Sequence, residues 1–272
     1  MAVIMLLAYT TTDSVSAAAA ERLKPMLGMV HDADLRGHRH FSSGPIEMLE
    51  LSTPLVDAEM LDSLGSWDLI VFLSRHRSAR GVPAFTVHAE GNWGQSADMG
   101  GTPRELGMAA PVQMLGFLRS ISSAASMAGA KAQVVYEATH HGPLLRTPSF
   151  FAEMGGSEEA MSDPVMLDTF VSAVADFVKG QSDPTPAGKV AVYLGGTHYP
   201  AKATAMALGK GYAFAHIMPK HFVAETGMLA QAFERSRPRP TGAVIEWKSI
   251  NAVARDKLVQ TLDLLGFEYE RA

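Results

Sequence analysis

The sequence predicts an α/β fold in which a mostly parallel or mixed sheet is covered by helices on both faces. Several short runs rich in β-branched and aromatic residues are apolar on both sides, which is typical of strands buried between two layers. Segments with recognisable helix ends alternate with these runs. The chain has 272 residues, of which 47% are hydrophobic, so it is long enough to bury a large core.

The predicted strands are short and apolar. They are Val3 to Ala8, Leu69 to Leu73, Phe85 to His88, Gln133 to Glu137, Val190 to Leu194 and Ala243 to Trp247. The first run is short and lacks the cationic flank of a signal peptide, so it is expected to be a strand. Because no other apolar run approaches the roughly 18 residues of a membrane span, a soluble, cytoplasmic protein is expected.

Two helices are predicted from their end signals in the middle of the chain. Thr102 to Glu105 has the N-cap, N1 proline and N3 glutamate of a capping box, and Pro111 is expected to break or restart that helix. Asp163-Pro164 opens a second helix, whose apolar side chains form one stripe before Gly180 ends it. The second helix is therefore expected to face the core.

A last helix is predicted to start near Asn251 and to end at Gly266. Its apolar stripe consists of Leu258, Leu262 and Leu265. Residues 180–188 are dominated by glycine, proline and small polar residues, which favours a linker. We expect one domain over residues 1–272, within which two subdomains could be joined near residues 180–188.

Composition excludes several classes of function. The net charge is −5 and 19% of residues are charged, so any RNA contact must come from a local basic patch. There are no cysteines, which excludes disulfides, thiolate zinc sites and a cysteine nucleophile. The motifs of serine lipases, dinucleotide-binding folds, P-loop enzymes and zincins are also missing from the sequence.

Histidines follow several of the predicted strands. His76, His88, the pair His140-His141 and His198 all come after such apolar runs. In open parallel sheets the carboxyl ends of the strands face the ligand crevice, so these imidazoles are candidates for one site. The alternative is that each is a hydrogen-bonded loop residue without a functional role.

The segment Glu137 to Pro143 brings a carboxylate and two imidazoles to the end of a strand. A neutral imidazole can accept a proton near pH 7, and a neighbouring carboxylate can orient it. The segment therefore favours base chemistry or metal ligation. In the structural alternative, Glu137 pairs with an arginine and one histidine caps a turn.

Two further segments are candidates for substrate binding. Gly195-Gly196-Thr197-His198 precedes a helical run, and its backbone N–H groups could face a developing oxyanion, although two glycines can also form a simple turn. Arg75 and Lys220 lie in cationic segments that could hold phosphates, or could be solvated loops. The proline-rich basic segment Arg235 to Pro240 could touch an RNA backbone.

Five motifs together resemble the archaeal and plant-type D-aminoacyl-tRNA deacylases, in order and in spacing. They are Ser74-Arg75-His76, Thr86-Val87-His88 with Gly91-Asn92, Glu137 to Pro143, Gly195-Gly196-Thr197-His198-Tyr199, and His216 with Pro219-Lys220. The resemblance implies hydrolysis of the ester between a D-amino acid and tRNA. It also implies a fold related to peptidyl-tRNA hydrolase and nucleoside phosphorylases, a zinc requirement and a monomer.

On this resemblance, His88, Glu137, His140, His141 and His198 are expected to be catalytic. The expected zinc ligands are His140, His141 and His198. The expected substrate contacts are Arg75, His76, Gly195, Gly196, Thr197, His216 and Lys220. The residues leave open whether the attacking water is activated by a histidine base alone or also by zinc.

Three rival functions remain open on the sequence. The nearest is a hydrolase of another tRNA-linked ester, such as peptidyl-tRNA. A second is a non-catalytic RNA-binding protein that uses the basic loops alone. A third is a metal-dependent or phosphorolytic enzyme that acts on a nucleoside, because one fold can carry several functions.

Overall fold

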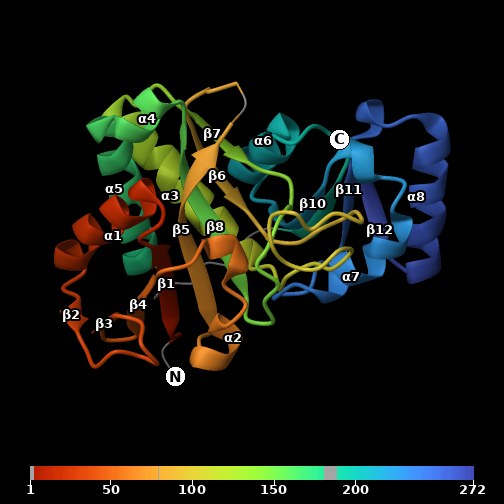
Figure 1. Cartoon of the computed structure of the whole chain (residues 1–272). Coiled ribbons are helices and arrows are strands. Elements are labelled where there is room, and N and C mark those ends of the chain that lie inside the picture. The colour runs from red at the N-terminus through yellow and green to blue at the C-terminus, as the bar shows by residue number, and fades with distance from the viewer. Residues whose placement is uncertain (1–2, 79, 181–188) are drawn as a thin grey trace.

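The computed structural model describes residues 3–78, 80–180 and 189–272, and places two sheets side by side (Figure 1). The strands of the first sheet are β1 (Met5–Thr10), β2 (Val30–His31), β3 (His40–Ser43), β4 (Ile46–Leu51), β5 (Leu69–Arg77), β6 (Ala84–His88), β7 (Gln133–Tyr136) and β8 (Ser149–Gly156). Within the described residues, these eight strands follow the order β2-β3-β4-β1-β5-β8-β6-β7. β1 is parallel to β4 and β5, and β5 to β8, whereas β6 is antiparallel to β8. The predicted mixed and mostly parallel sheet is confirmed.

Both faces of this sheet are covered. The helices on one face are α1 (Ser14–Met26), α3 (Pro111–Ala128), α4 (Glu158–Ser162) and α5 (Pro164–Gly180). Leu7 of β1 packs into the cluster beneath α1, α3 and α5, whereas its neighbour Leu6 packs on the other face against η1 (Leu55–Asp57) and α2 (Leu61–Leu64). Consecutive strand residues are therefore buried on opposite faces, as the two-sided apolar pattern predicts.

The second sheet contains the C-terminal part of the chain. Its strands are β9 (Val190–Leu194), β10 (Ala213–Met218), β11 (Gly242–Ile245) and β12 (Glu268–Arg271), which run parallel in the order β10-β9-β11-β12. Its helical segments are α6 (Ala201–Lys210), η2 (Lys220–Phe222), η3 (Thr226–Met228), α7 (Leu229–Glu234), η4 (Trp247–Ser249) and α8 (Ala252–Leu265). Phe214 of β10 shares one core cluster with Phe117 of α3, so the two sheets are packed together.

Each predicted strand is present, with shifted ends. Val190–Leu194 is a strand over the predicted range, whereas the strand predicted from Ala243 ends at Ile245 because Trp247 enters η4. The sequence reading missed the strands β2, β3, β4, β8, β10 and β12. The core strand β8 was missed because a glutamate and two glycines interrupt its apolar run.

The helix predicted from Thr102 to Glu105 is absent from the described residues. Arg104 has φ +56° and its N–H donates to the carbonyl of Gly94, which ties the segment to an extended loop. The next helix, α3, begins at Pro111. The local capping signal was therefore overridden by pairing with a distant segment of backbone.

The other two predicted helices are confirmed. Asp163 accepts a hydrogen bond from the N–H of Val165 at the start of α5, which runs to Gly180. Asn251 caps α8, and Gly266 ends it with φ +74°. Leu258 and Leu262 are buried as expected, but the third residue of the predicted stripe, Leu265, is 37% exposed.

The predicted linker falls almost wholly outside the described residues. Gly180 ends α5, and residues 181–188 are not among those that the structure describes. Among the described residues, no helix combines the length and the apolar character that a bilayer crossing would require.

Candidate active site

Residues at the ends of three strands, drawn from both sheets, meet at one place. His88 ends β6, while His140 and His198 lie in the loops after β7 and β9. The N–H of Ala138 donates to the carbonyl of His198 over 2.8 Å. This bond joins the loop after β7 directly to the second sheet, so the site is built from both halves of the chain.

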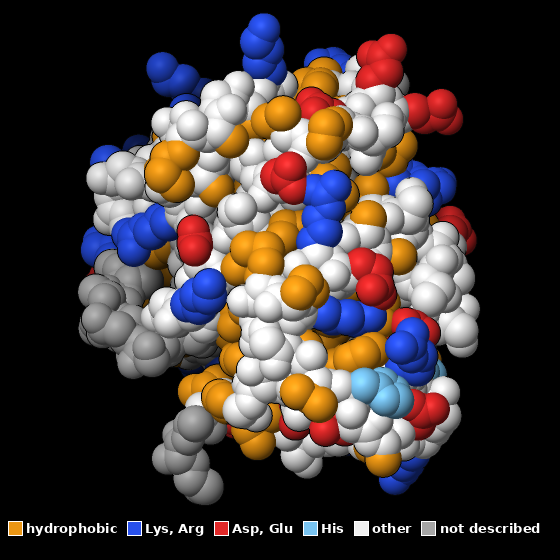
Figure 2. Space-filling model, turned by 90° about the vertical axis from the view of Figure 1, so that its left-hand side faces the viewer, with side chains coloured by type: hydrophobic (Ala, Val, Ile, Leu, Met, Phe, Trp, Pro, Cys, Tyr) orange, Lys and Arg blue, Asp and Glu red, His pale blue; other side chains and the backbone are white. Residues whose placement is uncertain are grey.

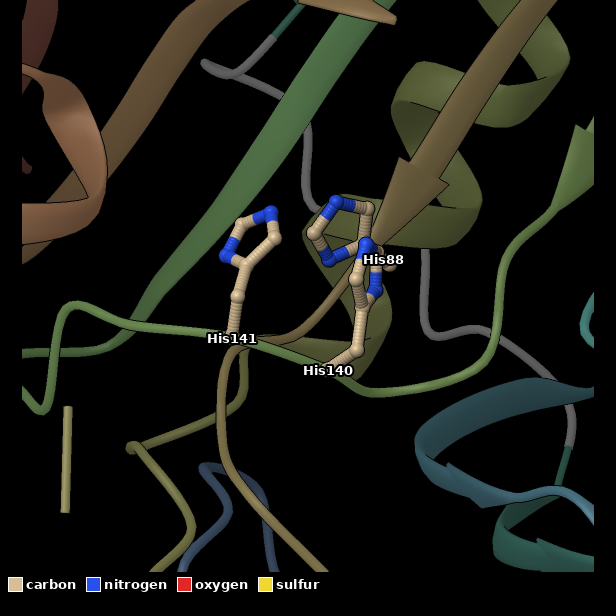
Figure 3. A group of neighbouring side chains, drawn as sticks. All are labelled: His88, His140 and His141. Carbon is tan, nitrogen blue, oxygen red and sulfur yellow. The ribbon is translucent and has the colours of Figure 1, made fainter. Parts of the chain in front are cut away.

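His88, His140 and His141 form a compact group (Figure 3). Their ring centroids lie 4.2 to 4.9 Å apart, and one ring nitrogen of each lies within 4.8 Å of the others. Each ring donates its Nδ1–H to a backbone carbonyl, at 3.1 Å for His88, 2.9 Å for His140 and 2.5 Å for His141. Because a carbonyl can only accept, these contacts fix the tautomer and leave the Nε2 lone pairs of His140 and His141 available. Burial lowers the pKa of His88, but Glu153, 3.8 Å from its Nε2, raises it above the ordinary value.

Two of these histidines are held neutral. Burial and the neighbouring imidazoles lower the pKa of His141 to about 4 and the pKa of His140 well below its usual range. A neutral imidazole can accept a proton or ligate a metal ion. Both rings therefore have the protonation state that the predicted chemistry requires.

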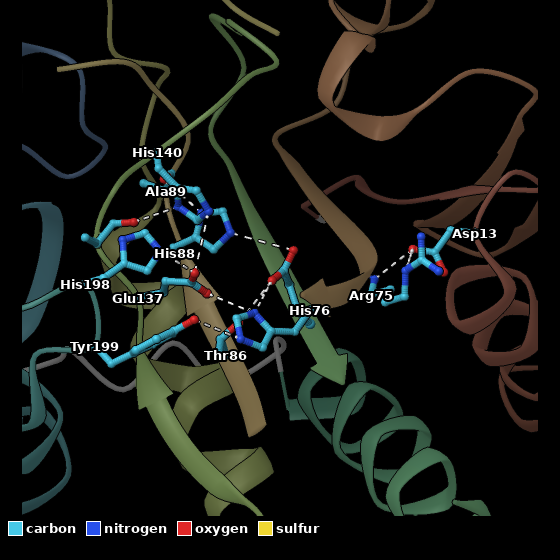
Figure 4. A network of polar contacts seen from close by, with 12 residues as sticks. Asp13, Arg75, His76, Thr86, His88, Ala89, Glu137, His140, His198 and Tyr199 are labelled. Atoms are coloured by element: carbon cyan, nitrogen blue, oxygen red, sulfur yellow. Dashed lines mark hydrogen bonds and ion pairs between the residues drawn. The ribbon is translucent and has the colours of Figure 1, made fainter. Parts of the chain in front are cut away.

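Glu137 lies at the centre of the polar network (Figure 4). Its Oε1 accepts a hydrogen bond from His198 Nε2 at 2.7 Å and lies 3.6 Å from His140 Nε2. Although burial raises the pKa of Glu137, the hydrogen bond with His198 and the ion pair with His76 hold it well below the usual range. The side chain of Glu137 is 3% exposed and that of His198 is 39% exposed. A buried carboxylate therefore orients an imidazole that solvent can reach.

His76 lies between two carboxylates. Its Nδ1 is 3.3 Å from Oε2 of Glu137 and 3.2 Å from Oε2 of Glu153, while its Nε2 is 3.1 Å from the hydroxyl of Tyr199. Burial lowers the pKa of His76, but the two carboxylates outweigh it and raise the pKa to about 10. The side chain is only 2% exposed, yet His76 forms part of the wall of the cavity beside the cluster, so its substrate contact stays a prediction next to its internal ion pair.

Sequence reasoning did not identify Glu153 as part of the site. It is 5% exposed and accepts a hydrogen bond from the hydroxyl of Thr86 at 3.1 Å. The signal that could have revealed it is a single carboxylate within the otherwise apolar strand Ser149–Gly156. A buried charge of this kind requires partners.

A cavity of about 440 Å³ opens beside the cluster, at the carboxyl ends of β1 and β5. Its lining includes His140, His141, Phe151 and, at the far side, Arg75. Asp13 accepts a hydrogen bond from the Arg75 N–H at 3.0 Å and lies 3.9 Å from its Nε (Figure 4). The structure thus places Arg75 on the wall of the same ligand-sized space that His140 and His141 line.

The glycine turn after β9 does not offer the predicted oxyanion contacts. The N–H of Gly195 donates to the carbonyl of Met218, and that of Gly196 to the hydroxyl of Ser249, each at 2.8 Å. Both residues have positive φ, and a Cβ on Gly196 would lie 2.5 Å from a carboxylate oxygen of Glu246. The expectation is therefore wrong, because both N–H groups are used and the glycines serve the turn and its packing.

The remaining predicted substrate contacts differ in their surroundings. Thr197 and Lys220 are both exposed, and the N–H of Lys220 donates to the carbonyl of Gly196 at 2.9 Å. His216 is 0% exposed and its Nε2 lies 2.8 Å from the carbonyl of Arg235. The prediction that His216 binds substrate is therefore wrong, because the ring is sealed inside the second sheet.

Comparison with known proteins gives a consistent result. A family model described as D-aminoacyl-tRNA deacylase matches residues 64–270. The D-aminoacyl-tRNA deacylase of Ignicoccus hospitalis is 37% identical over 203 residues, which cover 74% of this chain and 80% of the relative. That of Pyrococcus horikoshii is 34% identical over 221 residues, which cover 79% of this chain and 78% of the relative.

A further relative and one solved structure extend the comparison. The D-aminoacyl-tRNA deacylase of Methanoregula boonei is 38% identical over 225 residues, which cover 81% of this chain but 49% of that longer protein. The crystal structure of AF0625, a conserved protein of unknown function, covers 100% of this chain and 96% of its own, with a TM-score of 0.89 and 24% identity. The likeness to AF0625 concerns the fold alone, and it spans both sheets.

Proposed function

The chain belongs to the D-aminoacyl-tRNA deacylase family, and from this membership we infer that it hydrolyses the ester bond of D-aminoacyl-tRNA, releasing a D-amino acid and free tRNA. The observation on the site that carries the mechanism is the buried Glu137 carboxylate, hydrogen-bonded to the partly exposed His198. An aminoacyl ester is already activated, so a positioned base and charge stabilisation can suffice without a covalent intermediate.

In the proposed mechanism, His198 acts as the general base. It removes a proton from a water molecule that attacks the ester carbonyl carbon, and Glu137 stabilises the resulting imidazolium, as the orienting carboxylate of a catalytic triad does. When the bond from the carbonyl carbon to the ribose oxygen breaks, His198 returns the proton to that oxygen. His76, charged between Glu137 and Glu153, offsets the carboxylate charge that burial would otherwise penalise.

The three-histidine group fits the zinc ion that the family resemblance implies. In the part of the chain that the structure describes, the buried Nε2 of His88 has no hydrogen-bond partner, and His140 and His141 present their own Nε2 atoms beside it. This set favours His88 over His198 as the third ligand, because His198 pairs with Glu137. Bound zinc would supply a Lewis acid and lower the pKa of a bound water to about 7.

We place the tRNA acceptor end on the open side of the cluster, near Thr197 and Lys220, with Arg75 at the cavity wall as a phosphate contact. On the face that α1 presents, cations and carboxylates are interspersed (Figure 2), and Arg22 pairs there with Asp168. Such a mixed surface does not favour an RNA backbone. We propose that the enzyme works as a cytoplasmic monomer.

The decisive experiment is deacylation of matched D- and L-aminoacyl-tRNA, with and without a chelator. Release of the D-amino acid with little release of the L form supports the proposed function. Faster hydrolysis of N-blocked L-aminoacyl-tRNA would instead identify a peptidyl-tRNA hydrolase. Full activity of a metal-free preparation after chelation would exclude the zinc version and leave the histidine base alone.

A further inference from the structure

Glu153 is a buried carboxylate that the proposed chemistry does not use directly. It lies in the middle of β8, opposite Ser74 of β5 and Thr86 of β6. Its strand neighbours Ala152 and Met154 are fully buried. Burial of a carboxylate costs several kcal/mol unless it is paired, so its partners indicate what it does.

The partners of Glu153 are two imidazoles of the site. Its Oε2 lies 3.2 Å from His76 Nδ1 and accepts a hydrogen bond from the Thr86 hydroxyl at 3.1 Å. Its Oε1 lies 3.8 Å from His88 Nε2 (Figure 4). One carboxylate in the central strand therefore holds side chains from the strands on both sides of it.

His76 connects Glu153 to Glu137. The same Nδ1 of His76 lies 3.3 Å from Oε2 of Glu137, so the imidazole is clamped between the two carboxylates. The other oxygen of Glu137 holds His198 at 2.7 Å. Any shift of His76 would therefore change the direction in which Glu137 presents Oε1 to His198.

We propose that Glu153 is a positioning residue for deacylation: by holding His76 against Glu137, it fixes the orientation of the Glu137–His198 pair. The inference rests on the proposed function. Glu153 forms part of the cavity wall, but it is only 5% exposed and its Oε2 contacts His76 and Thr86, so its effect is assigned to His76. The general reason is that a base must be held within a fraction of an ångström of its productive position.

The test substitution is Glu153→Gln, which keeps the size and one oxygen acceptor but removes the charge. We expect kcat for a D-aminoacyl-tRNA to fall at least about tenfold while KM stays within about twofold, since substrate contacts are untouched. Thr86→Val, which removes the other hydrogen bond to the same oxygen, is the matched control and should keep kcat within about threefold. Circular dichroism and thermal melting verify that each variant is folded. If Glu153→Gln does not fold, Glu153→Asp, which withdraws the carboxylate but keeps its charge, takes its place.

A double-mutant cycle with His76→Gln separates positioning from a purely structural role. Once His76 is replaced, Glu153→Gln should reduce kcat little further, because its effect passes through the missing ring. An equal loss of kcat in both backgrounds, or an unchanged kcat in the folded single variant, would overturn the proposal. A wild-type protein that fails to release the D-amino acid would instead overturn the proposed function itself.

Discussion

His76 and His198 both contact Glu137 but differ in how far solvent reaches them. His76 is 2% exposed between Glu137 and Glu153, and its pKa is raised to about 10, so it keeps its proton near neutral pH. The ring of His198 is 39% exposed. A ring that water reaches can exchange protons with a substrate during turnover, which supports the proposal that His198 is the base.

Replacement of His198 tests this assignment. We expect His198→Gln to lower kcat about 10²- to 10⁴-fold, the range that one general base contributes, with little change in melting temperature. His31→Gln is the matched control, since His31 is an exposed residue of β2 remote from the site. The rate of single-turnover deacylation is measured for both variants. An unchanged rate in His198→Gln would show that another residue is the general base.

His216 should make stability depend on pH. Burial lowers the pKa of His216 to about 4 from its ordinary value of 6.5. Between these values the unfolded state binds more protons than the folded state, so the free energy of unfolding decreases as the pH falls from about 6.5 to about 4, by at most about 3 kcal/mol. Urea unfolding at about pH 7 and about pH 5 should show a smaller pH effect in His216→Gln than in the wild type.

Most of the cluster could be predicted from position alone, because His88, Glu137, His140 and His198 follow strands whose ends meet. Glu153 was not predicted because its strand, β8, was not predicted, so its single carboxylate among apolar residues could not be placed next to the histidines. His216 was misassigned for the opposite reason. It resembles a site residue in sequence, but the packing of β10 turns its ring into the core.

At the level of elements, the histidine loop depends on a close glycine contact. A Cβ on Gly142 would lie 2.5 Å from the carbonyl oxygen of Val56 and would also crowd the backbone of Gly100 and Gly101. The N–H of Gly142 donates to the carbonyl of Met99 at 3.0 Å. The loop that carries His141 is thus seated against η1 and the loop at residues 99–101.

Replacing Gly142 with alanine tests whether the close packing at this position outweighs the gain in stability that comes from restricting the unfolded backbone. Gly142→Ala is expected to destabilise the protein by about 1–3 kcal/mol, because backbone atoms must move, and to lower kcat by shifting the adjacent His141. Gly209→Ala is the control, since its Cβ would meet nothing within 4 Å in α6, and it should stabilise by about 0.5–1 kcal/mol. Denaturant unfolding of both variants gives the comparison, and equal effects would contradict the packing argument.

The elements that were predicted correctly share strong local signals. The start of α5 at Asp163 and the start of α8 at Asn251 are each fixed by a side-chain cap within the helix itself. The segment Thr102 to Glu105 shows equally good capping residues, yet its backbone bonds to that of Asn92 and Gly94, outside the segment. Local signals determine an element only where no long-range pairing competes for the same backbone groups.

At the scale of the whole molecule, a bound metal ion should stabilise the folded state. Zinc at about 100 times its Kd would raise the free energy of unfolding by about 2.7 kcal/mol, because its proposed ligands, His88 at the end of β6 and the His140-His141 pair after β7, come together in the folded chain. We expect zinc to raise the melting temperature of the wild type and of His31→Gln, but not of His141→Gln. An equal shift in all three would place the ion elsewhere.

The hydrogen bond between Ala138 and His198 joins the two sheets, which should constrain how such enzymes evolve. Glu137 lies after β7 of the first sheet and His198 after β9 of the second, so neither half carries the complete proposed reaction centre. We therefore expect substitutions in one half to be accepted only when they suit the geometry of the other half. A chimaera that joins the first sheet of this chain to the second sheet of a distant homologue should fold and yet turn over poorly, until compensating changes realign the two halves.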